Sequence, residues 1–142
     1  MADTVDVRYL YPANYDDMPN PTPTRRVVVQ MTGLSDGTGE TDIVKVRLSD
    51  LLMHTGLAPT RTAVEKIVGN VYGMTVQLEW DRSPRAEIKL LGAGRYNLDY
   101  HSVGGLVDPG EEGDRTGNII LSSLYTDSGD SYDLTLTVRL KQ

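Results

Sequence analysis

The two histidines are the side chains in this sequence best suited to acid–base chemistry. His54 follows a short apolar segment, and His101 stands two residues after Asp99 and directly before Ser102. A catalytic triad needs its members to converge from different elements, which near neighbours along one strand do not do. Ser102 also lacks the Gly-x-Ser-x-Gly elbow of a strand-to-helix nucleophile. We therefore expect hydrogen-bonded or exposed histidines, and we predict no catalytic residue.

Two acidic loops offer oxygen ligands of the kind that hard cations such as Ca²⁺ prefer. One is 36–42, where acids alternate with Gly and Thr, and the other is the Gly-rich stretch with Asp108, Glu111, Glu112 and Asp114. Neither has the Asp-x-Asp-x-Asp-Gly order or the distal glutamate of an EF-hand loop. Asp and Gly are also the ordinary residues of turns. We predict turns, no metal and no cofactor, with a cation in either loop left as the alternative.

Trp80 has two interpretations. It ends an alternating segment and shares the phase of Val76 and Leu78, which points it inward as a core anchor. An exposed Trp would instead be a stacking platform for a sugar or a partner. The alternation favours the core.

Strand-period alternation must position all of these side chains. In 131–141, five apolar residues alternate with polar ones, so one face of that strand must be core. The segments 74–80 and 86–90 alternate likewise around Arg82-Ser83-Pro84, which predicts a β-hairpin. Weaker strands are expected at 5–11, 25–32, 42–48, 62–72, 95–101 and 118–124.

Helix signals are few. A Ser49 cap and Gly56 delimit one short helix over 49–54 at most. About nine strands with so little helix predict an all-β protein, an antiparallel β-sandwich, for which we favour a jelly roll. Gly- and Pro-rich turns are expected at 12–24, 33–39, 92–94, 104–117 and 127–130. No repeat or composition shift divides the chain, so we expect a single domain over 1–142.

The segment 11–24 is the least able to form regular structure, because its four prolines lack backbone donors. It predicts an extended arm or loop, which either packs on its own domain or reaches a neighbouring subunit or partner. Its apolar anchors, Tyr11, Tyr15 and Met18, are the predicted partner-binding residues.

Composition limits the classes of partner. The chain has 142 residues, with 14 Lys and Arg against 20 Asp and Glu and a net charge of -6. Such a balance opposes phosphate neutralisation, so we expect no nucleic acid partner. No apolar run approaches the roughly 20 residues of a membrane span, and no basic, apolar leader begins the sequence, so we expect a soluble, unprocessed protein without a membrane partner.

Cysteine is absent, which excludes disulfides and thiolate metal sites. Aromatic usage is eight Tyr, one Trp and no Phe, which suits interface anchors.

Several stretches, spread over nearly the whole chain, together carry a further pattern. They are VRYLYP at 7–12, DGTGETD at 36–42, LEWD at 78–81, GGLVDP at 104–109, TGNIIL at 116–121 and SGDSYDLTL at 128–136. This pattern resembles a family of small virion structural proteins of tailed bacteriophages, of the capsid decoration or cement type. Members of that family commonly have Asp where Asn118 stands, a departure that affects no expected role.

The resemblance implies a non-enzymatic β-sandwich or jelly roll that binds the outside of an icosahedral shell at capsomer boundaries. It implies the major capsid protein as partner, a homo-oligomer that is a dimer or trimer, and a place on the capsid surface of a virion assembled in the host cytoplasm. It assigns no catalytic residue.

Three alternatives stay open. The first is a carbohydrate-binding β-sandwich that stacks sugars on tyrosines or on Trp80. The second is a neck or tail structural component of the same particle. The third is a glycan hydrolase, which needs two carboxylates at a set separation. Its only support is the number of carboxylates in the sequence, and this support is weak because some pair among 20 acids will always be close.

Overall fold

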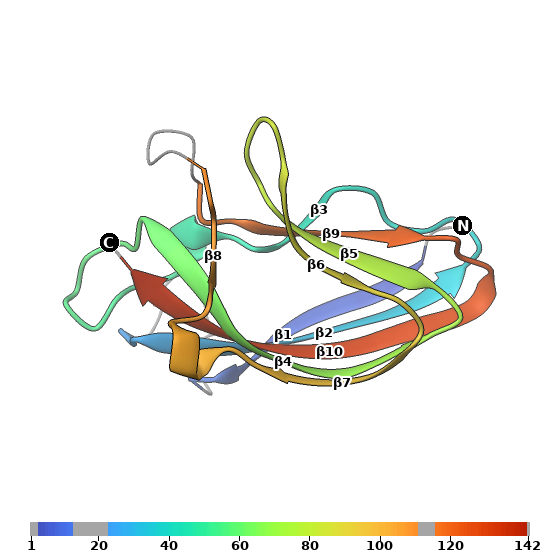
Figure 1. The fold of residues 1–142 in the computed structure, drawn as a ribbon, viewed down its shortest axis with the longest axis horizontal. Coiled ribbons are helices and arrows are strands. Elements are labelled where there is room, and N and C mark those ends of the chain that lie inside the picture. The colour runs from blue at the N-terminus through green and yellow to red at the C-terminus, as the bar shows by residue number, and fades with distance from the viewer. Residues whose placement is uncertain (1–2, 13–22, 111–115, 142) are drawn as a thin grey trace.

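The computed structural model describes residues 3–12, 23–110 and 116–141, and it consists of two antiparallel β-sheets packed face to face (Figure 1). The larger sheet has six strands in the order β1-β2-β10-β4-β7, with β8 beside β4, and the smaller has the order β3-β9-β5-β6. The strands are β1 Thr4–Tyr11, β2 Arg26–Asp36, β3 Ile43–Val46, β4 Arg61–Tyr72, β5 Thr75–Trp80, β6 Ala86–Leu91, β7 Gly94–Asp99, β8 Leu106–Val107, β9 Ile119–Leu124 and β10 Ser128–Lys141.

The predicted all-β antiparallel sandwich is therefore confirmed, and the jelly roll stays a prediction. All nine predicted strands are present, and β5 pairs with β6 as the predicted hairpin. The tenth strand, β8, has only two residues, too few for an alternation pattern to reveal. No helix in the described part of the chain has the length and apolarity that crossing a membrane requires.

Alternating side chains from both sheets form one apolar core. On β10 the inward residues Tyr132, Leu134, Leu136, Val138 and Leu140 are all buried, as the sequence pattern predicts. Trp80 is 1% exposed and belongs to the same core, so its prediction as a core anchor is confirmed. A buried Trp offers no stacking surface to a sugar.

The predicted helix over 49–54 is wrong beyond its first turn. Only a 3-10 turn, η1 (Leu48–Asp50), forms there. Its N-cap residue is Arg47 and not the expected Ser49, and the Arg47 side chain makes no capping hydrogen bond. Leu48, Leu51 and Met53 are all buried, so this segment follows the core edge in an extended path instead of turning away as a helix.

The predicted turn over 33–39 begins too early, because β2 continues to Asp36. Gly33 lies within the strand, opposite Tyr132 of β10. A β-carbon at Gly33 would stand 2.4 Å from Cε1 of the Tyr132 ring, so glycine is needed there for close packing and not for a turn.

A buried polar cluster joins the two sheets at the side of Tyr132. Its hydroxyl donates a hydrogen bond to Oε1 of Glu40, and Lys45 Nζ lies 2.6 Å from Oε2 of the same carboxylate. Glu40, Lys45 and Tyr132 are each at most 7% exposed. Burial and the hydrogen bond to Glu40 raise the pKa of Tyr132. The cluster attaches β10 of the larger sheet to the β2–β3 connection and to β3 of the smaller one.

Candidate functional site

The starts of β2 and β4 and the end of β10 bring cationic side chains together at one end of the larger sheet. Arg26 of β2 is opposite Arg139 of β10, and Lys141 of β10 is opposite Arg61 of β4. Directly opposite residues in antiparallel strands share a face. Since the intervening residues Val138 and Leu140 point into the core, these cations lie on the outer face. Their strands meet at the end of the sheet where β10 finishes, on the left of Figure 1.

A hollow of about 460 Å³ opens at this end of the sheet. Cationic and imidazole side chains dominate its lining, and Glu65 is the one acid among its lining residues. We call it the cationic hollow, and its charged and imidazole side chains are Arg25, Arg61, Arg139, Lys141, His54, His101 and Glu65.

Two loops form the walls of the cationic hollow. The loop with His54 is fixed beside β2, because the Thr24 N–H donates to Leu52 O at 3.1 Å and Thr24 forms a bridge with Met53. The turn with His101, η2 (His101–Val103), is fixed to β4, because the Tyr100 N–H donates to Glu65 O at 2.7 Å. Backbone contacts therefore hold both histidines of the chain at the same hollow.

A β-bulge sets the position of Glu65. Thr137 is opposite Lys66 and the next residue, Val138, is opposite Val64, so Glu65 has no partner on β10. Such a bulge re-aims the extra side chain. Glu65 is 3% exposed, and its carboxylate accepts from Arg26 Nε at 2.5 Å and lies 3.8 Å from His101 Nε2.

The charge balance of the cationic hollow is positive. Glu65 forms a hydrogen-bonded ion pair with Arg26, which raises the pKa of Arg26. Within residues 3–12, 23–110 and 116–141, the side chains of Arg25, Arg139 and Lys141 make no ion pair. A protein whose net charge is -6 thus concentrates unpaired cations at one end.

Tyr11 lies beside this hollow on the same outer face. It is opposite Val28 in the β1–β2 register and is 55% exposed. A second hollow, of about 500 Å³, is lined by Tyr11, Arg25, Arg26 and Val28 among others, so the two hollows share Arg25. We name the two hollows together the binding surface. Of the three predicted partner-binding residues, Tyr11 lies on it, whereas Tyr15 and Met18 lie outside the described residues.

Both histidines are exposed, as expected, and the side chain of His101 is 64% exposed. The His101 backbone N–H donates to Asp99 Oδ1 at 2.9 Å. What sequence reasoning missed is the convergence of both histidines with Arg61, Arg139 and Lys141. The only sequence signal was a set of basic residues at the ends of separate predicted strands, which becomes a cluster only when the strand order is known.

The described acids of the two candidate metal loops, Asp36, Glu40, Asp42 and Asp108, all have protein partners. Asp36 Oδ1 accepts the Thr38 N–H at 3.0 Å, and hydrogen bonding with Thr38 lowers the pKa of Asp36. Asp108 Oδ1 accepts the Gly110 N–H at 2.8 Å and lies 2.9 Å from Arg82 Nε. No group of three potential metal ligands occurs among the described residues, which do not include Glu111, Glu112 and Asp114.

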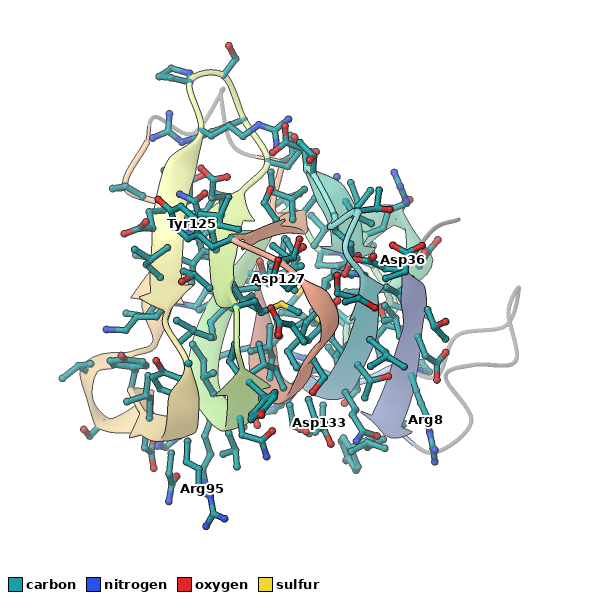
Figure 2. The ribbon with its side chains drawn as sticks, turned by 90° about the vertical axis from the view of Figure 1, so that its right-hand side faces the viewer. Arg8, Asp36, Arg95, Tyr125, Asp127 and Asp133 are labelled. Carbon is teal, nitrogen blue, oxygen red and sulfur yellow. The ribbon has the colours of Figure 1, made fainter. Side chains whose placement is uncertain are left out.

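Asp36 and Asp127 lie at the end opposite the cationic hollow. Figure 2 shows that end, with Asp36 at the end of β2, Asp127 between β9 and β10, and Arg8 and Arg95 also in view. The molecule therefore has an uneven distribution of charge along its long axis, with cations gathered where β10 ends and acids where β10 begins.

Comparison of the chain with protein-family models, with curated proteins and with solved structures finds no match.

Proposed function

We propose that this protein is a non-enzymatic structural component of a tailed-bacteriophage virion, which binds the outer surface of the capsid and stabilises it. The observation that carries the proposal is the binding surface, where exposed Tyr11 lies beside Arg25, and where Arg25, Arg139 and Lys141 make no ion pair within the described residues. Tyr and Arg are enriched in the contact regions of protein interfaces. The resemblance to capsid decoration proteins supplies the kind of particle.

The chemistry of the binding surface indicates an acidic partner. Guanidinium groups bind carboxylates through two parallel hydrogen bonds, which gives geometric specificity as well as energy. Arg61 and Arg139 are held on paired strands, which place side chains more reproducibly than loops do. We therefore expect the major capsid protein to present a carboxylate-rich outer surface to this end of the sandwich.

The uneven charge distribution favours one orientation of docking. An acidic shell attracts the end with Arg139 and Lys141 and repels the end with Asp36 and Asp127. Contact with two or three shell subunits makes each later contact intramolecular, so individually weak contacts can secure the shell. A protein of this kind is expected on the capsid surface of virions assembled in the host cytoplasm.

The strand order supports the jelly-roll arrangement expected for such a protein. Without β1 and β8, the sheets have the orders β2-β10-β4-β7 and β3-β9-β5-β6, which gives the eight strands in two sheets typical of jelly rolls. The sandwich is a rigid support for a surface at its end.

The experiment is to mix the purified protein with capsids that lack it and to image the particles. Regular added density at symmetry positions of the shell is the expected result. Density confined to the neck or tail would instead identify the protein as a component of that part of the virion. Turnover of a small molecule that is abolished by changing His101 would contradict a non-enzymatic role.

The carbohydrate alternative retains exposed tyrosines as stacking platforms, since Tyr72 and Tyr125 are 70% and 85% exposed whereas Trp80 is buried. A glycan array probed with the purified protein and with Tyr72→Ala and Tyr125→Ala tests it. Binding that both substitutions leave unchanged would exclude these two rings as its platforms.

A further inference from the structure

The first strand, β1, is an open edge of the larger sheet. It pairs with β2 on one side and with no other strand of the described chain on the other. Figure 2 shows β1 at the margin of the sandwich, with Arg8 extending from it. The backbone N–H and C=O groups on the outer side of such an edge strand are available to pair with another strand.

The side of β1 that faces the core is apolar but incompletely covered. Val7 and Tyr9 are opposite the fully buried Met31 and Val29 of β2, yet both are only half-buried. Val5 continues this row and is 43% exposed. The apolar row thus extends beyond the area that the smaller sheet covers, and a neighbouring strand would complete its burial.

The opposite side of β1 is charged. Asp6 and Arg8 alternate with the apolar row, both are exposed, and neither forms an ion pair within the described residues. Because these two opposite charges lie two residues apart on one face, each can pair with the other residue of a second, antiparallel copy: Asp6 with Arg8, and Arg8 with Asp6.

The other edge strands of the sandwich are shorter than β1, and so offer less backbone for pairing with another strand. β3 has four residues and an irregular register with β9, and β6 and β7 have six residues each. β1 has eight residues, and its one irregularity lies between Tyr9 and Tyr11. Short and irregular edges are the usual protection against edge-to-edge pairing, and most of β1 lacks it.

We propose that β1 pairs antiparallel with β1 of a second copy of this chain, about a two-fold axis at Val7. Val7 is then opposite Val7 of the other copy. Asp6 is opposite Arg8 twice, and Val5 is opposite Tyr9 twice. Both opposite-charge pairs lie on the outer face, and the apolar rows of the two copies join on the core face.

The charges select this register over its neighbours. A shift by two residues in one direction places Asp6 opposite Asp6, and the same shift in the other direction places Arg8 opposite Arg8. Like charges directly opposite each other destabilise a strand pair. A shift by one residue would set the apolar row of one copy beside the charged row of the other. The β1 sequence therefore specifies one symmetric, isologous pairing.

This inference concerns the isolated protein and does not depend on capsid binding. The test is sedimentation equilibrium of the full chain, in which we expect a reversible dimer. Asp6→Arg and Arg8→Asp should each weaken dimerisation by about tenfold, because each places like charges opposite one another at two sites. The double variant Asp6→Arg/Arg8→Asp restores both opposite-charge pairs and should restore the wild-type dissociation constant. Both side chains are exposed, so an unchanged melting temperature checks the fold of each variant.

A second measurement reads the register directly. The protein has no cysteine, so Val7→Cys introduces a unique thiol on the two-fold axis. Opposite residues in antiparallel strands have Cα atoms roughly 4.5 to 5.5 Å apart, which a disulfide can span. Oxidation should crosslink the Val7→Cys protein into a dimer. The control Val5→Cys should not crosslink, because its thiol is opposite Tyr9.

Two results would overturn the proposal. One is a chain that stays monomeric up to about 1 mM, so that any dissociation constant lies well above the millimolar range. The other is a dimer that neither single charge reversal weakens and in which Val5→Cys crosslinks as well as Val7→Cys does.

Discussion

Arg26 of β2 reaches Glu65 of β4 across the intervening strand β10, with Nε of the guanidinium 2.5 Å from Oε1 of the carboxylate. The contact is possible because the bulge in β4 frees Glu65 from a partner on β10. It has an electrostatic consequence. The one acid among the residues lining the cationic hollow forms an ion pair with Arg26, so the charges of Arg139 and Lys141 remain available to a partner.

Glu65→Gln tests this relationship. The substitution removes a buried carboxylate and leaves Arg26, which is 34% exposed, with a neutral partner. We expect a loss of about 1 kcal/mol in the free energy of unfolding, since solvent partly screens the Arg26 charge. We also expect stronger binding of an acidic partner, because the hollow gains positive charge. Chemical denaturation measures the first effect, with exposed Glu87→Gln as the matched control. Equal stability of both variants would contradict a structural role for the pair.

Lys45→Met tests the buried cluster between the sheets. The change leaves the carboxylate of Glu40 inside the protein without its cation, which typically costs about 3 to 5 kcal/mol. The double variant Glu40→Leu/Lys45→Met removes both charges and should regain part of that loss, because the Tyr132 hydroxyl then lacks its acceptor. Thermal denaturation compares the two, with Lys89→Met as the control. A single variant as stable as the wild type would show that the cluster contributes nothing.

The raised pKa of Tyr132 predicts a loss of stability in alkali. An unfolded tyrosine ionises near pH 10, whereas folded Tyr132 keeps its proton to a higher pH. The unfolded state therefore loses the proton first, and the contribution of Tyr132 to stability is complete below about pH 10 and declines above it. Urea midpoints measured from pH 8 to pH 11 should fall less steeply for Tyr132→Phe than for the wild type. Parallel curves would contradict this assignment.

Gly33→Ala tests the close packing of β2 on β10. The new methyl would overlap the Tyr132 ring at 2.4 Å, so the ring or the strand must shift. We expect a loss of about 1 to 3 kcal/mol. Gly92→Ala is a suitable control, because a β-carbon there meets nothing within 4 Å. If Tyr132→Ala does not relieve the effect of Gly33→Ala in the double variant, the overlap is not its cause.

Local periodicity predicted most of the fold, because inward and outward alternation is a property of each strand alone. The alternate residues from Tyr132 to Leu140 and from Val76 to Trp80 could be assigned to the core on that basis, and both assignments are confirmed. The extent of β2 could not be predicted. Gly33 is a turn residue by local preference, and its role in the strand depends on Tyr132, which is distant in sequence but adjacent in the sheet.

The binding surface was predictable only in part. Tyr11 could be proposed because it begins a Pro-rich segment, and the structure places it on an exposed face. The cationic hollow could not be proposed, because Arg61, Arg139 and Lys141 belong to strands whose adjacency depends on the sheet order. The two histidines belong to separate loops, so local sequence does not indicate that they lie at the same hollow.

The most direct test of capsid binding is the occupancy of capsids that lack this protein after incubation with matched variants. Arg139→Glu/Lys141→Glu reverses two charges of the cationic hollow, and Arg95→Glu reverses one on the far side of the molecule (Figure 2). All three residues lie on the surface, so the free energy of unfolding of each variant should stay within about 0.5 kcal/mol of the wild-type value. The proposed function predicts wild-type occupancy for Arg95→Glu and at least roughly tenfold weaker binding for the double variant. Full, regular occupancy by the double variant would contradict it.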